Sequence, residues 1–258
     1  MLKSLIILAA CSLLSGDAAL KLPSYIKACS YNDPNFNQCA LKHGKEAIPK
    51  LLNGDRKYGF PPLDPMYVEE VMVKESGITI KAINFTIEGA RDVDLKHISV
   101  DFDKQTISFD LNVPQAIFRG KYEMAGKLVQ LPISGNGDFN CTYEDLYVNY
   151  KTEYKLVRRK DGEIYAKPTD YDLDFKPQNL IINFNNLFNG NKLLGDAMNK
   201  FLNENWRLVL DEIGKPAYKA LGLIVHQIVT NVAKKVPFKE LFLDTPAIPG
   251  NVEDEFDV

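Results

Sequence analysis

The chain has 258 residues, 45% of them hydrophobic, with a formal net charge of -3 and a pI near 5.7. A chain of this length can bury a sizeable core in one elaborate domain or in two small ones. Its charge provides no general cationic field, which argues against nucleic acid as a partner and against strong attraction to anionic membranes.

The N-terminal residues 1–18 have the pattern of a signal peptide. A lysine precedes an apolar run over 5–14, and Gly16 and Ala18 are small residues that suit signal peptidase. We expect cleavage after Ala18. The apolar run is short for a membrane anchor, and no later stretch reaches about 18 uninterrupted apolar residues. The sequence therefore predicts a secreted, extracellular protein without a stable membrane anchor.

Three cysteines remain after cleavage, because Cys11 lies in the signal peptide. Cys29 and Cys39 flank the polar loop SYNDPNFNQ and predict a small disulfide ring, which contributes roughly 2–3 kcal/mol on the chain-entropy model. Two reduced cysteines are the alternative. The odd count leaves Cys141 as a buried thiol. No Cys/His spacing resembles a zinc site, so we expect no metal and no cofactor.

Two N-x-T sequons, at Asn84 and Asn140, are candidate glycosylation sites in a secreted protein. Ile83, Phe85 and Ile87 alternate, which places Asn84 on the opposite, solvated face of a strand and favours attachment there. Sequons also occur by chance, so both sites are hypotheses.

A helix is expected over 37–52, and FPPLDP at 60–65 predicts an extended connection. Alternating segments with turns between them then recur over 66–188 and predict a series of strands. Residues 107–113 and 171–175 place apolar side chains on one face and polar side chains on the other. One face of the sheet is therefore apolar and the other solvated.

The apolar set changes face near Ile83 and again between Leu95 and Ile98. A change of face within one strand indicates a β-bulge, which bends and twists the strand. We therefore infer a strongly curved sheet. The expected hairpin turns are DK at 103–104, GNGD at 135–138 and DG at 161–162.

Residues 191–235 carry helical periodicity, with apolar residues every three or four positions. Beyond Pro216 the helix is apolar in most directions, as at Leu223, so it must be buried on several sides. Pro216 lacks an N–H, and we expect a kink or a short break near Gly214. A sheet that wraps around this helix satisfies both elements. The space between them is a ligand tunnel or, alternatively, a dry packed core.

An ordered set of segments resembles the insect takeout and juvenile hormone-binding protein family. These segments are the signal peptide, Cys29 and Cys39, YGFPPLDP at 58–65, HISVDFDKQTISFDLNVP at 97–114, GKYEMAGKLVQLPISGNGDF at 120–139, NENWRLVLDEIGKP at 203–216 and VPFKELF at 236–242. The resemblance is nearer the takeout branch, because hormone carriers that add a second disulfide would need a partner for Cys141.

The resemblance implies one α+β domain over 19–245, with a highly curved antiparallel sheet wrapped around a long C-terminal helix, similar to the tubular lipid-binding fold. It also implies an internal hydrophobic tunnel that carries small or elongated ligands, such as juvenile hormone or other lipids, without chemistry. The candidate lining residues are Phe85, Phe102, Phe109, Tyr122, Met124, Phe139, Trp206, Val209, Ile213, Ile224 and Ile228. Ordinary core packing is the alternative for each of them.

Two other functions compete with this one. A secreted lipid hydrolase needs a nucleophile elbow of the G-x-S-x-G type, which the sequence lacks, and His43, His97 and His226 are scattered. We therefore expect no catalytic residues. An extracellular signalling or interaction protein with a packed core is the other candidate. The acidic tail over 246–258 is interpreted as a solvated, disordered segment, with contact to a partner as the alternative. A receptor or a membrane is the candidate partner at ligand delivery, although no basic amphipathic tip stands out in the sequence.

Overall fold

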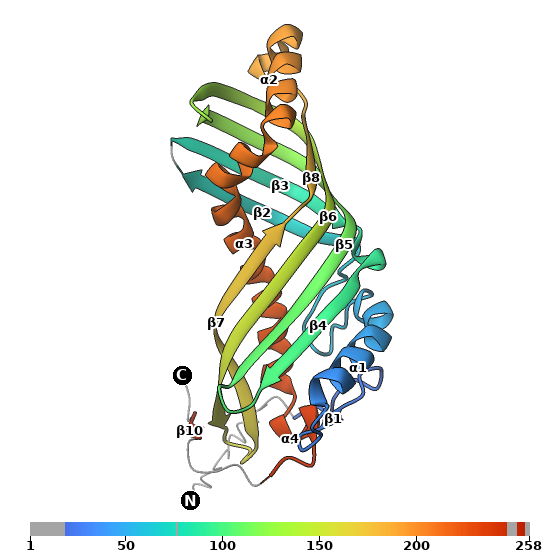
Figure 1. Ribbon diagram of the computed structural model, residues 1–258. Helices are drawn as coiled ribbons and strands as arrows, with labels where there is room; N and C mark the ends of the chain where they lie inside the picture. The colour runs from blue at the N-terminus through green and yellow to red at the C-terminus, as the bar shows by residue number, and fades with distance from the viewer. Residues whose placement is uncertain (1–18, 76, 247–251, 256–258) are drawn as a thin grey trace, which may run out of the picture.

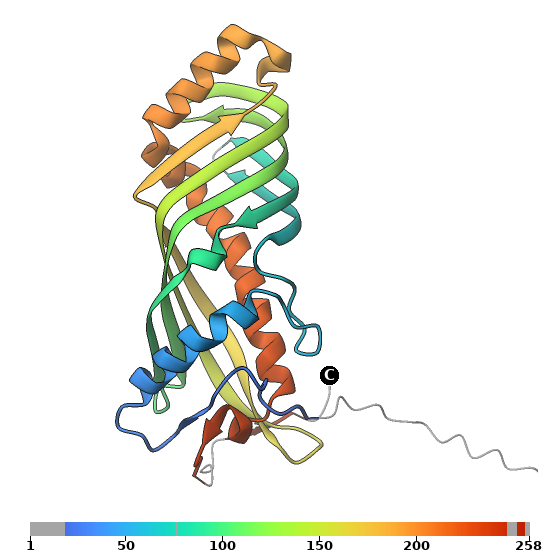
Figure 2. The ribbon, with the colours of Figure 1, turned by 90° about the vertical axis from the view of Figure 1, so that its right-hand side faces the viewer.

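The computed structural model describes residues 19–75, 77–246 and 252–255. It has the predicted α+β architecture, a curved antiparallel sheet that curls around a long C-terminal helix (Figures 1 and 2). The predicted signal peptide lies outside the described residues.

One long hairpin is the spine of the sheet. Its strands, β5 (Thr106–Leu128) and β6 (Leu131–Arg158), pair antiparallel along the whole of β5, and β6 continues beyond Glu153, its last residue paired with β5. Because both strands are much longer than a usual strand of about 5–6 residues, each pairs with two further strands along its outer edge. The molecule is therefore elongated, with an upper and a lower half in the view of Figure 1.

The remaining strands divide between these halves. In the upper half, β3 (Ile78–Glu88) pairs with β5 and with β2 (Met66–Glu75), and β8 (Asn179–Phe184) pairs with β6. In the lower half, β4 (Asp94–Asp101) pairs with β5, and β7 (Ile164–Lys176) pairs with β6. At the lower end, β1 (Cys29–Ser30) lies parallel to β9 (Phe242–Leu243).

Both predicted bulges are present. The β3–β5 register shifts between Ile83 and Thr86, and the β4–β5 register shifts between Leu95 and His97. At the first bulge Asn84 has a φ of 48°. The apolar pattern of the strands thus predicts the bulges that curve the sheet, and this curvature lets the sheet enclose a helix.

Two of the three predicted hairpin turns are confirmed, and the third is wrong. Residues 103–104 and 161–162 lie in the turns that follow β4 and β6, whereas 135–138 lies inside β6. Gly135 allows the Tyr122 side chain to pack close to the β6 backbone, since an added Cβ would lie 2.7 Å from the Tyr122 hydroxyl. The turn that joins β5 to β6 is formed by Val129 and Gln130, both with positive φ. Glu212 stabilises this turn by accepting the Val129 N–H at 2.7 Å.

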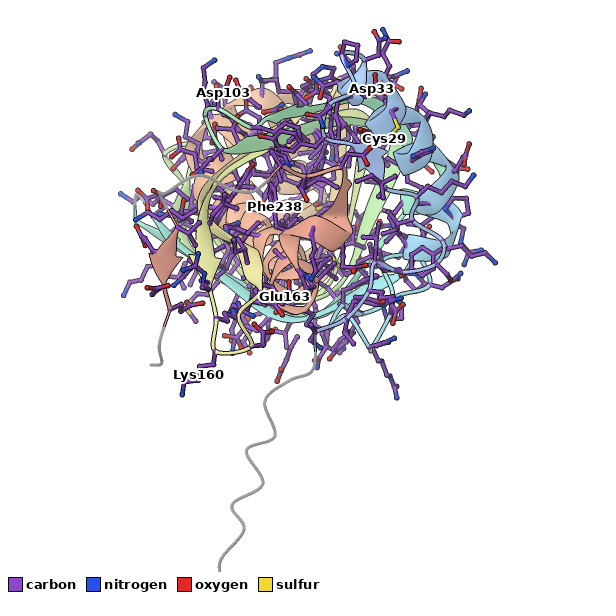
Figure 3. All side chains as sticks on the ribbon, turned by 90° about the horizontal axis from the view of Figure 1, so that it is seen from below. Cys29, Asp33, Asp103, Lys160, Glu163 and Phe238 are labelled. Carbon is purple, nitrogen blue, oxygen red and sulfur yellow. A yellow bond between two sulfur atoms is a disulfide. The ribbon has the colours of Figure 1, made fainter. Side chains whose placement is uncertain are left out.

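In the described part of the chain, four α-helices accompany the sheet. They are α1 (Phe36–Leu51), α2 (Lys192–Glu204), α3 (Trp206–Lys235) and α4 (Phe238–Leu241), with short 3₁₀ turns at Ala90–Asp92 and Phe188–Gly190. Helix α1 packs on β4, α2 on β8, and α3 between β7 and β2. Viewed along the long axis, α3 lies in the middle, with the strands and α1 around it (Figure 3).

A kink or a short break was expected near Gly214, and the structure has no break there. The helical pattern over 191–235 is interrupted at Asn205, while Pro216 lies inside an unbroken α3. The Asn205 side chain caps the end of α2 by donating to the Phe201 carbonyl at 2.8 Å. Two residues after Pro216, Tyr218 stacks on Phe175 of β7 with ring centroids 4.9 Å apart. Packing against the sheet thus favours a continuous helix over the local preference for a break.

The sheet encloses most of α3 but not its whole circumference. Leu223, which was expected to be buried, is 52% exposed. Lys219 and Lys215 are exposed on the same side, one and two turns earlier, respectively. The sheet is a half-barrel, and this stripe of the helix fills its open side.

The C-terminal tail is ordered where the structure describes it. Glu253 and Asp254 form β10, which pairs parallel with Val157 and Arg158 of β6. Val252 packs against the apolar cluster of the lower half. The expectation of a solvated, disordered tail is therefore wrong for residues 252–255, because a free strand edge and nearby basic side chains bind them.

The first bulge gives a test of what allows the sheet to curve. An added Cβ at Gly120 of β5 would lie 2.4 Å from the Cβ of Phe85, so we expect Gly120→Ala to reduce the free energy of unfolding by about 1–3 kcal/mol through overpacking. Urea unfolding measures this. In α2, an added Cβ at Gly195 would meet its nearest atom at 3.7 Å. Gly195→Ala is the matched control and should stabilise slightly. Equal effects of the two substitutions would contradict the packing argument.

Candidate ligand-binding cavity

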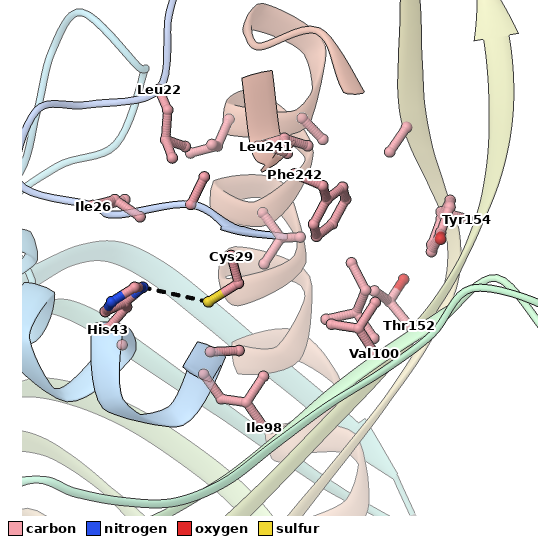
Figure 4. A pocket seen from close by; sticks show the side chains of 18 of the residues that line it. Leu22, Ile26, Cys29, His43, Ile98, Val100, Thr152, Tyr154, Leu241 and Phe242 are labelled. Carbon is pink, nitrogen blue, oxygen red and sulfur yellow. Dashed lines mark hydrogen bonds between the residues drawn. The ribbon is translucent and has the colours of Figure 1, made fainter. Parts of the chain in front are cut away.

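An apolar cavity of about 380 Å³ lies in the lower half of the molecule. Its volume falls within the range of small-molecule sites. Strands β4 to β7 form one wall, the N-terminal segment and α1 form the opposite wall, and the last turns of α3 lie between them (Figure 4). Leu241 and Phe242 close the end. The cavity is thus built from segments that are far apart in the sequence.

Aromatic rings brace the lower end of this cavity. Phe102, which follows β4, packs against Tyr31, Phe36 and Phe242 with ring centroids 4.0, 5.1 and 5.1 Å away. Phe36 and Phe242 line the cavity themselves. These contacts hold the start of α1 and strand β9 against the sheet.

Few polar groups reach this cavity. Thr152 is almost fully buried, and its hydroxyl lies 2.8 Å from the Asp170 carbonyl and 3.0 Å from the Glu153 carbonyl. The single hydroxyl proton of Thr152 is donated to these carbonyls, so Thr152 can only accept a hydrogen bond from a ligand. The Tyr154 hydroxyl has no hydrogen-bond partner among the described residues. Burial raises the pKa of Tyr154 well above its usual value, so this hydroxyl remains a donor.

The predicted disulfide between Cys29 and Cys39 is confirmed, and it forms part of the wall. His43 Nδ1 lies 3.3 Å from the Cys29 sulfur and 3.6 Å from the Cys39 sulfur. Within the described residues this is the one Cys/His/acid group close enough to hold a metal ion. Both sulfurs are used in the disulfide, so neither is available as a thiolate ligand. The disulfide instead ties the N-terminal segment to α1 within this wall of the cavity.

The predicted lining residues lie along the whole length of the molecule. Ile228 lines the cavity, and Phe102 packs at its end. Phe109 stacks on Tyr150 in the lower half, with ring centroids 4.9 Å apart. Phe85, Phe139 and Ile224 belong to an apolar cluster in the middle, whereas Tyr122, Met124, Trp206, Val209 and Ile213 belong to the cluster under α2 and β8. The structure therefore does not bring the eleven residues together at one cavity, and their contact with a ligand stays a prediction.

The sequence-based prediction missed most of the wall that faces the sheet. Ile26, Ala40 and His43 line the cavity from the N-terminal side, and Leu241 and Phe242 line it from the C-terminal side. Two signals pointed to this region, the small disulfide ring and the apolar segment VPFKELF. Neither signal showed that the two segments meet.

His226 lies between the buried Tyr150 and a polar groove that is lined by residues of α3 and β7. Its Nδ1 lies 2.8 Å from the hydroxyl of the fully buried Tyr150, and its ring stacks on Tyr171 at 4.7 Å. Burial raises the pKa of Tyr150 to about 12, so the phenol is protonated and donates to the neutral imidazole. Burial also lowers the pKa of His226, partly offset by Asp170 and the backbone of Thr169. This geometry gives His226 a structural role.

Both sequons are exposed. Asn84 Oδ1 accepts the Tyr67 hydroxyl at 2.6 Å, which leaves Nδ2, the atom that would carry a glycan, unengaged among the described residues. Asn140 is exposed on β6. The next residue, Cys141, is a free cysteine whose pKa burial raises to about 12. It therefore remains a protonated, unreactive thiol. Glycan attachment stays a prediction for both asparagines.

The chain is similar to a known protein family over most of its length. The family model described as haemolymph juvenile hormone binding protein matches residues 5–243. The chain belongs to the haemolymph juvenile hormone binding protein family.

Relatives and solved structures agree with this family. The chain is 29% identical over 242 residues to the circadian clock-controlled protein daywake of Drosophila melanogaster, covering 88% of this chain and 90% of that protein. Daywake of Drosophila yakuba is 24% identical over 238 residues, with the same coverage. The crystal structure of Takeout 1 from Epiphyas postvittana matches with a TM-score of 0.76 and 25% identity, over 84% of this chain and 100% of that chain. These matches confirm the family resemblance and the fold.

The family is named for binding, which fits the apolar cavity. Helices in the described part of the chain are all too short or too polar to cross a membrane.

The lowered pKa of His226 predicts how stability depends on pH. As the pH falls from about 7.5 to about 5, the unfolded chain takes up a proton at this histidine before the folded protein does. The free energy of unfolding should therefore decrease across this range, and it should decrease less in His226→Gln. Urea unfolding at both pH values measures the two losses. His97→Gln alters a more exposed histidine and is the control; equal losses in wild type and His226→Gln would contradict the assignment.

Proposed function

We propose that the protein is a secreted carrier that binds one small or elongated hydrophobic molecule, a terpenoid or a fatty lipid, without changing it chemically. The observation that carries this proposal is the cavity of about 380 Å³, whose walls are almost entirely apolar. Membership of a family named for juvenile hormone binding supports it. Juvenile hormone is one candidate ligand within this class.

The energetics of burial fit such a carrier. Transfer of each methylene from water to an apolar site is worth about 0.8 kcal/mol. A ligand with a dozen carbons therefore gains enough to offset the loss of translational and rotational freedom on binding. The cavity walls are tied by the disulfide and by a ring of aromatic contacts, so little ordering free energy is spent when the ligand enters.

We also propose how the cavity orients its ligand. Tyr154 offers a hydroxyl proton and Thr152 offers a lone pair, on the same strand and two residues apart. A ligand with one oxygen near its end can bond to these groups while its chain remains in the apolar part. For a longer ligand, the predicted lining residues of the middle and upper clusters extend the site along α3 into a tunnel.

A larger side chain inside the cavity tests the location of the site. Ala40 of α1 lines the cavity, so Ala40→Phe places a ring where the ligand would lie. We expect the affinity for a fluorescent fatty-acid probe to fall at least about tenfold, which corresponds to 1.4 kcal/mol. Ala197→Phe puts the same ring on an exposed position of α2 and is the matched control. Retained affinity in a folded Ala40→Phe variant would place the ligand elsewhere, and no probe binding by the wild type would favour an interaction protein with a packed core.

Removal of one hydroxyl tests the polar contact. Tyr154→Phe should weaken binding of a fatty acid or terpenoid ester by about 0.5–1.5 kcal/mol, because the ligand oxygen loses a donor. Binding of an alkane of the same length should not weaken. Titration calorimetry with the matched pair of ligands measures both effects, and an equal change for the two ligands would exclude a hydrogen bond from Tyr154.

A further inference from the structure

Four basic side chains gather at the lower end of β6 and β7. Lys155 and Lys167 face each other across the β6–β7 ladder, and Arg158 and Arg159 follow at the end of β6. The guanidinium of Arg159 stacks over the Tyr165 ring at 4.3 Å. We call Lys155, Arg158, Arg159 and Lys167 the basic end surface.

The chain covers this surface with its own acidic tail. Glu253 pairs with Lys155 at 2.8 Å, and Asp254 pairs with Arg158 at 3.5 Å. Glu255 lies between the other two cations, 3.3 Å from Arg159 and 2.6 Å from Lys167. Each of the four cations thus has a carboxylate partner from residues 253–255.

Two of the four ion pairs in this cover are weakly held, whereas the side chains in the two Glu255 pairs are only 27–47% exposed. The Lys155–Glu253 and Arg158–Asp254 pairs have side chains that are 47–62% exposed, and exposed ion pairs contribute about 0–1 kcal/mol each and are screened by salt. Strand β10 adds only two residues to the sheet. An anionic partner that offers several charges at once can therefore displace the tail.

The position of the basic end surface indicates what that partner is. Tyr154 and Ala166 line the cavity, and the next residues along the same strands, Lys155 and Lys167, project from the opposite, outer face of that cavity wall. Val252, directly before β10, packs on the cluster that contains Tyr154 and Ala166. A partner that replaces the tail would lie against the cavity end of the molecule. For a protein with an apolar cavity, a lipid surface fits this position best, because such a surface can supply or accept apolar molecules.

We propose that the basic end surface docks on anionic phospholipid headgroups and that the acidic tail is its intramolecular competitor. Docking replaces the three tail carboxylates by lipid phosphates and carboxylates, and it sets the cavity end against the bilayer. The near-neutral charge of the whole chain is compatible with this, since the attraction is local and the tail conceals it.

The test measures binding to vesicles of phosphatidylcholine with and without phosphatidylserine, by sedimentation of the full-length, ligand-free protein. The variant Glu253→Gln/Asp254→Asn/Glu255→Gln uncovers the surface and should bind the phosphatidylserine vesicles at least about fivefold more than wild type. Glu69→Gln/Asp138→Asn/Glu204→Gln removes the same charge from exposed positions elsewhere and should bind like the wild type. Neutral vesicles should bind none of the three proteins.

The cations are then removed from the uncovered variant. A Lys or Arg near an anionic membrane is worth about fivefold in binding, so Lys155→Gln/Arg158→Gln/Lys167→Gln should reduce binding by about a hundredfold. Lys45→Gln/Lys96→Gln/Lys121→Gln, at other surface pairs, is the matched control and should retain most of the binding.

Three results would overturn the proposal. The first is that the tail variant and its acidic control bind phosphatidylserine vesicles equally. The second is that the substitutions in the basic end surface and the control lysine substitutions reduce vesicle binding equally. The third is that the protein binds a soluble polyglutamate peptide in place of the vesicles. Because no cavity ligand is present, the outcome is independent of whether the carrier function is correct.

Discussion

The structure depends on the burial of one helix that is apolar on most of its circumference. A flat sheet can cover only one side of α3, so the strands must bend around it. The two bulges, at Asn84 and near Lys96, supply the bend. The long β5–β6 hairpin extends the curved sheet along the helix. The exposed stripe of α3, marked by Lys215, Lys219 and Leu223, lies at the open side of the half-barrel.

The same constraint explains why a cavity exists at the lower end. The half-barrel alone leaves the last turns of α3 uncovered there, and α1 together with the N-terminal segment closes the gap. These segments are held in place by the Cys29–Cys39 disulfide and by aromatic contacts around Phe102. Apolar side chains from two sides therefore face each other across a space that neither fills. The carrier proposal gives this space its use.

Sequence alone predicted the elements whose signal is periodic and local. The phase slips located both bulges, the apolar pattern located α1 and the region of α2 and α3, and the spacing of Cys29 and Cys39 gave the disulfide. It failed where tertiary contacts decide. The Val129–Gln130 turn is held by Glu212 from α3, and α3 continues through Pro216 where Tyr218 stacks on Phe175 of β7. The cavity wall and the docked tail both depend on which distant segments meet, which no local pattern records. The net charge of the chain is close to zero, because the negative charges of the tail and the positive charges of the basic end surface cancel. The net charge therefore could not reveal either group.

The most direct test of the central claim is mass spectrometry of the purified protein, first native and then after organic extraction. The account predicts one apolar molecule per chain, a terpenoid or a fatty lipid, present in wild type and lost from Ala40→Phe. A wild-type protein that is empty, and that fails to take up such a molecule when it is supplied, would contradict the carrier function and leave the cavity as a packing defect beside a long buried helix.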